Sequence, residues 1–296
     1  MKDILTIENE FLRADIAPFG AELRKLTYLK NGTEILKPYH DPLWEGTAPL
    51  LFPICGRLWE HKTYIDGVTY PLTAHGFAMR SLFVVTEHTA DRIALMLCDD
   101  AETRASYPFR FRLTVTYTLR GASLETRLCI ENRDTRTMPV TAGFHPAFHI
   151  PPGDNENIEC AYLQFSNDAA PEAWRLTEGG YLLPGTDVYP TVDGNVIPLS
   201  EEMFEENSSV FFEKTAGSVT LKSLNTSFSV RLDYPDAPYL GLWKPQTPEA
   251  TFVCIEPWYG TPDYENKTTD LYEKRDMTML PAGETCDFAY TVTVEL

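Results

Sequence analysis

The sequence predicts an all-β fold built from stacked antiparallel sheets or from a barrel. Apolar residues recur at every second position along much of the chain, and turn residues interrupt this alternation every eight to fifteen positions. Helical periodicity is scarce, and neither a regular βαβ rhythm nor a fixed repeat occurs. No Gly/Ser-rich linker divides the chain, and all-β architectures reach this size as one unit. We therefore expect a single domain over residues 1–296.

The first turns and the clearest hairpin lie in the N-terminal half. Tight turns are expected at Asn31-Gly32 and Asp66-Gly67, because glycine readily adopts the positive φ that such turns need. Residues 109–119 alternate between apolar side chains and mainly Arg or Thr, and residues 124–130 alternate again after Arg120-Gly121. The two alternating segments form a predicted long hairpin with one apolar face.

The C-terminal half gives weaker signals. The stretch 151–157 is rich in Pro, Gly and Asn and predicts a loop, and Asp193-Gly194 predicts another tight turn. A few helical turns are expected over residues 199–206, where Ser200 could cap a segment with acids in its first turn. Alternation resumes over residues 219–232 and 288–296.

Composition restricts the partners and the location of the protein. Its 25 Lys and Arg against 43 Asp and Glu give a net charge of −18, which repels nucleic acid and anionic lipid. Hydrophobic residues make up 43% of the chain, which excludes a disordered acidic protein. The N-terminal segment carries acids where a secretory signal would be apolar, and no run approaches a membrane span. We expect a cytoplasmic monomer or homodimer without nucleic-acid or membrane partners.

Six cysteines lie far apart, without a CxxC pair and at too low a density for a disulfide scaffold. We expect them to be reduced and mostly buried. Cys55 lies beside Arg57, but nothing else in the pattern marks it as a nucleophile, so we expect it to be inert. Phosphate-binding glycine loops and a G-x-S-x-G nucleophile motif are missing from the sequence.

The first candidate for chemistry is His145, in the segment GFHPAFHI. Pro146 holds the preceding residue in an extended geometry. His149 follows four residues later, but four extended residues span roughly 13 Å, too far to share one ion. The acid of the HExxH motif is also missing, so no metal is expected. The alternative is an ordinary core histidine.

The second candidate is Glu256, in the segment TFVCIEPWYG. In a strand, Glu256 shares one face with Phe252 and Cys254, whereas Val253 and Ile255 share the other, so the carboxyl group does not lie on a polar face. Desolvation would raise its pKa and a nearby cation would lower it, which suits proton transfer near neutral pH. The alternative is an ion pair at a strand end.

A third cluster comprises Arg57, His75 and Arg80, three potential cations close together in an acidic chain. It suggests an anion or polyol site, with Gly56 and Gly76 allowing the backbone close to a ligand. A surface ion-pair network would explain the same residues. Four aromatic residues near the candidates offer flat faces of the kind that stack on sugar rings, although most aromatics are core residues. They are Trp59, Phe77, Trp243 and Trp258.

Several segments, in their order, resemble the aldose 1-epimerase (galactose mutarotase) superfamily, and most closely its LacX-like branch. They are PICGRLW, YIDGVTYPLTAHGF, GFHPAFHI and YLGLWKP…FVCIEPWYG. The resemblance covers essentially the whole chain. It implies a large antiparallel β-sandwich with the site on a concave face. It also implies an isomerase that interconverts the anomers of a hexose or related sugar without metal, nucleotide or other cofactor.

The resemblance also implies roles for individual residues. Glu256 would be the general base that removes the proton from the anomeric hydroxyl, and His145 the general acid that protonates the ring oxygen. His75 would orient the sugar at the ring oxygen or a neighbouring hydroxyl, and Arg57 would donate to hydroxyls. The residues expected to bind the substrate are Arg57, His75, Arg80, Asn207 and Trp243.

Two departures from the family pattern concern the substrate. Residues 204–209, FEENSS, place Asn207 where the family carries an acid that binds sugar hydroxyls. In hexose-phosphate epimerases of the superfamily an arginine follows HGFA, but here Met79 takes that place and Arg80 comes one position later. Two alternatives to a mutarotase stay open: a non-catalytic carbohydrate-binding or sugar-sensing protein, and a hexose-phosphate 1-epimerase.

Overall fold

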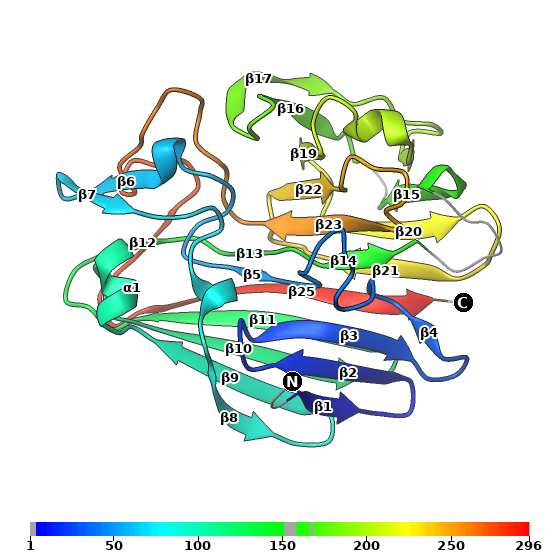
Figure 1. Cartoon of the computed structure of the whole chain (residues 1–296), viewed down its shortest axis with the longest axis horizontal. Helices are drawn as coiled ribbons and strands as arrows, with labels where there is room; N and C mark the ends of the chain where they lie inside the picture. Colours follow the sequence, from blue (N-terminus) through cyan, green and yellow to red (C-terminus); the bar gives the residue numbers. More distant parts are fainter. Residues whose placement is uncertain (1–3, 151–157, 167–168, 296) are drawn as a thin grey trace.

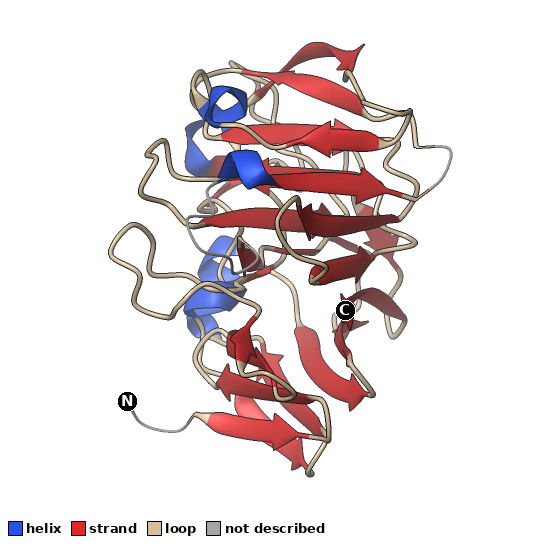
Figure 2. Cartoon of the chain, turned by 90° about the vertical axis from the view of Figure 1, so that its right-hand side faces the viewer, coloured by secondary structure: helices blue, strands red, loops and turns tan. Residues whose placement is uncertain are grey.

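The computed structural model of the chain describes residues 4–150, 158–166 and 169–295. Stacked antiparallel sheets make up most of it, which confirms the all-β prediction and selects the sandwich over the barrel (Figure 1). Figure 2 shows the same molecule from the side, with strands throughout and helices confined to short segments. No helix among the described residues is long and apolar enough to cross a membrane.

The largest sheet has nine strands in the order β18-β15-β20-β21-β25-β11-β10-β9-β8. The predicted hairpin β10–β11 lies within it, with Arg120 paired to Ser123 across the turn. The strands are β8 (Val84–His88), β9 (Arg92–Cys98), β10 (Phe111–Arg120), β11 (Ser123–Asn132), β15 (Ala161–Phe165), β18 (Val196–Pro198), β20 (Ser218–Ser223), β21 (Ser229–Asp233) and β25 (Thr285–Glu295).

A second sheet of eight strands has the order β17-β16-β19-β22-β23-β13-β5, with β14 also paired to β23. Its centre is β23, which reads as a nearly continuous apolar strand and is buried along its whole length. The strands are β5 (Leu50–Leu51), β13 (Gly143–Phe144), β14 (Ala147–His149), β16 (Glu172–Leu176), β17 (Leu182–Val188), β19 (Ser209–Glu213), β22 (Tyr239–Trp243) and β23 (Phe252–Trp258).

Smaller elements complete the described part of the fold: a four-stranded sheet, two two-stranded sheets and five short helices. The four-stranded sheet is β1 (Leu5–Glu8), β2 (Leu12–Ala17), β3 (Glu22–Tyr28) and β4 (Thr33–Glu34). The pairs are β6 (Lys62–Ile65) with β7 (Val68–Pro71) and β12 (Met138–Val140) with β24 (Thr278–Leu280). The helices are α1 (Ala101–Ser106) and the 3₁₀ turns η1 (Trp59–His61), η2 (Ala78–Arg80), η3 (Ile158–Cys160) and η4 (Glu201–Phe204).

One apolar core joins the layers. Buried residues of the four-stranded sheet, such as Leu12 and Leu26, belong to the same cluster as Leu113 and Val115 of β10. In Figure 1, β1–β3 lie in front of β8–β11. The buried hydroxyl of Tyr117 on β10 donates to the carbonyl of Ala21 at 2.7 Å, which places the two sheets in contact.

The predicted turns are present. The turn at Asn31-Gly32 connects β3 to β4, and the turn at Asp66-Gly67 connects β6 to β7. The turn at Asp193-Gly194 lies within the short bridge between Val192 and Val196. In each pair the glycine has φ between 75° and 83°. The loop expected over residues 151–157 lies outside the described residues, as does Leu296 at the end of the last predicted strand.

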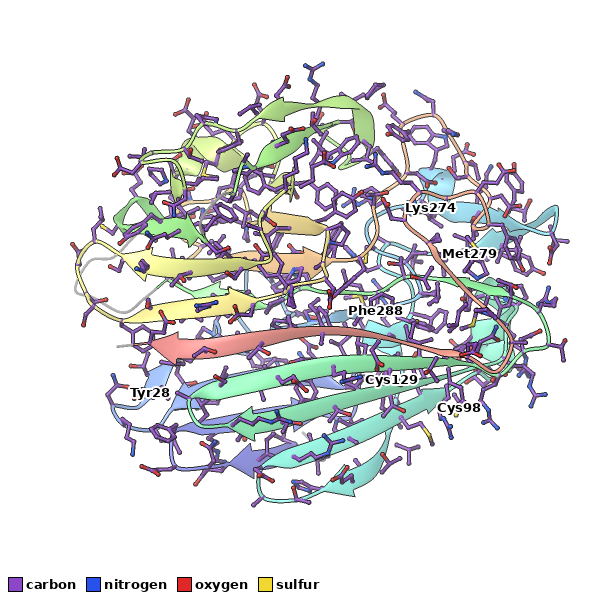
Figure 3. All side chains as sticks on the ribbon, turned by 180° about the vertical axis from the view of Figure 1, so that it is seen from behind. Tyr28, Cys98, Cys129, Lys274, Met279 and Phe288 are labelled. Carbon is purple, nitrogen blue, oxygen red and sulfur yellow. The ribbon has the colours of Figure 1, made fainter. Side chains whose placement is uncertain are left out.

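Three local expectations need correction. Residues 199–206 form only the 3₁₀ turn η4, and the Ser200 side chain makes no capping hydrogen bond, although two acids do begin the turn. The α-helix lies instead at α1, which Asp100 caps through a reciprocal box with Thr103. All six cysteines are free, but four are only half-buried, among them Cys98 on β9 and Cys129 on β11 (Figure 3).

Candidate functional site

A pocket of about 340 Å³ opens on the eight-stranded sheet, and every residue predicted to act in the site lines it. Strands β19, β22 and β23 provide the floor, and loops before β6, before β8 and after β16 provide the walls. The structure thus brings together side chains separated by up to two hundred positions in the sequence. The predicted residues in the pocket are Arg57, His75, Arg80, His145, Asn207, Trp243 and Glu256.

Glu256 reaches the pocket because of the alternation in β23. Val253 and Ile255 point into the main core, whereas Phe252 and Cys254 belong to a small cluster with Trp44 and Trp243 beside the pocket. Glu256 shares this second face and is only 2% exposed. Burial raises the pKa of its carboxyl group well above the usual range. A hydrogen bond of 3.1 Å donated by the Trp258 indole lowers this pKa, but by less than burial raises it.

His145 lies between β13 and β14, where its backbone N–H donates to the carbonyl of Pro49. Its Nε2 is 3.3 Å from Oε2 of Glu256, and its side chain is 12% exposed. Burial lowers the pKa of the imidazole well below the usual range, and His75 lowers it further. Because burial disfavours charge on both partners, it favours a neutral pair that shares one proton between Oε2 and Nε2. Such a pair can accept one proton and release another.

His75 faces the same pair from the opposite wall. Its ring centroid is 5.7 Å from that of His145 and 5.4 Å from that of Trp258. The N–H of Gly56 donates to Nδ1 of His75 at 3.2 Å, so a neutral His75 carries its proton on Nε2 and can donate from there. Burial, followed by the charges of Arg57 and Arg80, lowers the pKa of His75 to about 4.

The two glycines beside these residues, Gly56 and Gly76, lie against neighbouring segments of the chain. A Cβ on Gly76 would lie 2.1 Å from the carbonyl oxygen of Phe52, and one on Gly56 would lie 2.6 Å from Pro262. The expectation that both glycines admit a ligand is therefore wrong for Gly76, which admits the neighbouring chain. Gly56 does line the pocket.

Arg57 and Arg80 are exposed at the pocket and make no ion pair within the described residues. Arg57 donates to the carbonyl of Gly179 at 2.8 Å, across the pocket from its own loop. Arg80 donates to the carbonyl of Gly76 at 3.1 Å. Because neither arginine forms an ion pair in the described part of the chain, a surface ion-pair network does not explain the cluster. Each guanidinium keeps further N–H donors beyond these backbone contacts.

Asn207 and Trp243 form the wall next to β19. The Trp243 indole donates to Ser208 Oγ at 3.0 Å, which fixes the ring at the pocket edge. The Oδ1 atom of Asn207 is buried and has no hydrogen-bond partner in the part of the chain that the structure describes. An unpaired buried oxygen is costly, so it favours a ligand hydroxyl that would donate to it.

The sequence did not indicate two parts of the pocket. Trp44 lines it from the loop after β4, and its ring lies 4.9 Å from that of His145. The turn between β16 and β17, residues 178–180, lines the opposite side. Neither segment carries a motif, and only the fold brings them here. Trp59 and Phe77, by contrast, do not line the pocket but pack against Tyr181 and into the core.

Three side chains beside the pocket offer atoms of the kinds that ligate metals. His145, Cys254 and Glu256 offer ligand atoms within 4.8 Å of one another. Burial raises the pKa of the Cys254 thiol well above its usual range, and metals bind the thiolate. Cys55 is likewise buried, with its pKa raised to about 12, in agreement with the inert role expected for it.

Comparisons with known proteins identify the family of the chain. Residues 3–285 match the family model for aldose 1-epimerase. Protein LacX (plasmid) of Lactococcus lactis subsp. lactis is 28% identical over 300 residues, covering 98% of this chain and 99% of its own. A galactose mutarotase related enzyme from Lactobacillus acidophilus superposes with a TM-score of 0.93 at 31% identity, over 99% of this chain and 98% of that one.

A galactose mutarotase-like protein from Lactobacillus casei ATCC 334 gives the same TM-score of 0.93 at 29% identity, over 99% of this chain and all of its own. The similarity therefore includes the whole sandwich and the strands that form the pocket floor. By family model and by structural relatives alike, the chain belongs to the aldose 1-epimerase family.

Proposed function

We propose that the protein is a cofactor-independent aldose 1-epimerase that interconverts the α and β anomers of a hexose or related sugar. The observation that carries the proposal is the contact of 3.3 Å between His145 Nε2 and Glu256 Oε2 inside an aromatic pocket. A cyclic hemiacetal opens when one proton leaves O1 while another arrives at O5. One acid and one base in contact are sufficient for this reaction.

The proton shared by the pair explains how Glu256 becomes the base and His145 becomes the acid. Transfer from Glu256 to His145 across their contact produces a carboxylate and an imidazolium. Glu256 then accepts the proton of the O1 hydroxyl while His145 protonates O5 and the C1–O5 bond breaks. Rotation about C1–C2 presents the other face of the aldehyde. Reclosure returns a proton from O5 to His145 and from Glu256 to O1, so no proton is gained or lost.

The remaining pocket residues support binding in this proposal. Neutral His75 donates from Nε2 near the ring oxygen or an adjacent hydroxyl, and Arg57 and Arg80 donate to outer hydroxyls. The oxygen of Asn207 accepts from a hydroxyl. Trp243 offers a flat indole face to the sugar ring, a common feature of carbohydrate sites.

The direct test is mutarotation of freshly dissolved single anomers, followed by polarimetry over a panel of sugars. We expect acceleration over buffer, with Glu256→Gln and His145→Ala each losing about 10²–10⁴-fold, the typical contribution of a positioned acid or base. Absence of acceleration for every sugar would contradict the proposal. Saturable binding measured by calorimetry in that case, with affinity unchanged in Glu256→Gln, would identify a carbohydrate-binding protein instead.

A sugar carrying an anionic group is the second candidate substrate, because Arg57 and Arg80 line the pocket without an ion pair in the described residues. An anionic sugar would pair with both guanidinium groups. Strong competition by inorganic phosphate, together with a large loss of activity in Arg80→Ala, would support this substrate. Insensitivity to both would leave the neutral sugar.

A further inference from the structure

Lys37 is a buried lysine directly behind the pocket wall. It follows β4 and is only 1% exposed. Its Nζ donates to the carbonyl of Trp44 at 2.7 Å and to that of Pro38 at 3.2 Å. Within the described residues no carboxylate lies within ion-pair distance of it. Burying an ammonium group costs desolvation free energy, so specific contacts with its surroundings must offset that loss.

Aromatic faces provide those contacts. Nζ lies 5.3 Å from the ring centroid of Trp44 and 5.3 Å from that of Phe252, within the range of cation–π attraction. The Trp44 ring in turn lies 4.9 Å from the His145 ring at an interplanar angle of 31°. Lys37 therefore contacts both the backbone and the ring of the residue that covers His145.

The segment carrying Trp44 is also held at its other end. The carboxylate of Glu22 accepts from the N–H groups of Thr47 at 2.6 Å and Ala48 at 3.1 Å. Ala147, two residues after His145, accepts from the N–H of Lys37 at 3.0 Å and donates to the carbonyl of Thr47 at 2.8 Å. A buried cation and a buried anion thus fix residues 44–48 against the strand segment that carries His145.

His145 needs such support. A functional histidine is usually oriented by a hydrogen bond at its second ring nitrogen. Here Nδ1 of His145 is buried and has no partner in the described part of the chain. The ring contacts Glu256 at Nε2 and three neighbouring rings, of which Trp44 at 4.9 Å lies nearer than His75 at 5.7 Å and Trp243 at 5.9 Å.

From this geometry we infer that Lys37 is a positioning residue that holds Trp44 against His145 and so fixes the imidazole for proton transfer. This role rests on the proposed epimerase function for its effect on rate. The effect on Trp44 itself does not depend on that function.

The test combines Lys37→Met, which keeps an unbranched side chain one atom shorter but removes its charge, with Trp44→Ala in a double-mutant cycle. If Lys37 acts through Trp44, each single variant lowers kcat/KM at least tenfold, mostly in kcat, and the double variant is no worse than Trp44→Ala alone. Lys274→Met is the matched control, since Lys274 is 5% exposed and pairs with Asp263. Its effect should add to that of Trp44→Ala. Additive effects of Lys37→Met and Trp44→Ala would overturn the inference.

A second measurement keeps the inference testable without epimerase activity. In protein labelled with fluorotryptophan, the ¹⁹F resonance assigned to Trp44 should shift or broaden in Lys37→Met, whereas that of Trp174 should not. An unchanged Trp44 resonance would overturn the inference, whether or not the native protein catalyses mutarotation. If Lys37→Met does not fold, Lys37→Gln is measured instead, and the same outcomes decide.

Discussion

Two residues at the pocket floor illustrate how burial can create reactivity. A lone carboxylate or imidazolium in the position of Glu256 or His145 would lose most of its hydration, at a cost of several kcal/mol. Together they satisfy each other across 3.3 Å. The same desolvation raises the pKa of the carboxyl group and lowers that of the imidazole, so it favours the neutral pair over a carboxylate and an imidazolium. In water the proton would stay on the imidazole, and burial works against this preference.

His75 provides a prediction about the pH dependence of stability. Its pKa is lowered from 6.5 to about 4 in the folded chain. The unfolded chain therefore binds a proton that the folded chain does not, and stability falls as the pH drops from about 6.5 towards about 4. Between pH 7.5 and 4.5, His75→Gln should lose less stability than the native protein by up to about 2 kcal/mol. Guanidinium melts at the two pH values measure this, and equal losses would contradict it.

Among the structural elements, the turn that carries His75 depends on Gly76. Gly76 and Gly67 both have positive φ, of 72° and 75°, but only Gly76 lies against another segment, with the Phe52 carbonyl 2.1 Å from where its Cβ would be. Gly67→Ala should cost about 1–2 kcal/mol from backbone strain alone. Gly76→Ala should cost more than about 4 kcal/mol, or prevent folding, because the backbone must also move. Denaturant titrations compare them, and similar costs would contradict the close approach.

Alternation and turn residues predicted the elements whose pairing is local. The hairpin β10–β11 and the glycine turns are confirmed because strand register and turn geometry are set by residues close in sequence. The face on which Glu256 lies followed from the same two-residue period. The α-helix at α1 was missed because its capping box uses Thr103 where the usual pattern has Glu or Gln.

The rest of the pocket depends on contacts between distant segments. Trp44 and the β16–β17 turn reach the site through the packing of loops, for which the sequence offers no periodic signal. The contact between Arg57 and Gly179 joins residues 122 positions apart. Lys37 would have been assigned to the surface from its residue type, since lysine is almost never fully buried without partners.

At the scale of the whole molecule, the continuous core supports our proposal that the chain folds as one domain. Buried residues from the four-stranded, eight-stranded and nine-stranded sheets belong to one cluster. We therefore expect one cooperative unfolding transition, with far-UV circular dichroism and tryptophan fluorescence changing together. Because several tryptophans lie at the pocket, fluorescence reports the site and circular dichroism reports the sheets. Two separated midpoints would show that the layers unfold independently.

The net charge of −18 describes the surface as a whole, while the pocket carries Arg57, Arg80 and two histidines. A neutral sugar meets no long-range barrier from the acidic surface, whereas an anionic sugar is repelled until it reaches the arginines. The repulsion is screened beyond roughly 8 Å at physiological salt. Adding salt at low ionic strength should therefore leave kcat/KM unchanged for a neutral sugar and raise it for an anionic one. The opposite pattern would contradict steering by the surface charge.

The central claim is that Glu256 exchanges protons with the sugar, and anomer exchange at equilibrium measures this most directly. Exchange spectroscopy by NMR gives the rate at which α and β anomers interconvert in the presence of native protein, of Glu256→Gln and of Glu265→Gln, an exposed glutamate nine residues away. We expect native protein and Glu265→Gln to exchange the anomers at the same accelerated rate, and Glu256→Gln to be slower by about 10²–10⁴-fold. Full exchange activity in a folded Glu256→Gln variant would contradict the claim.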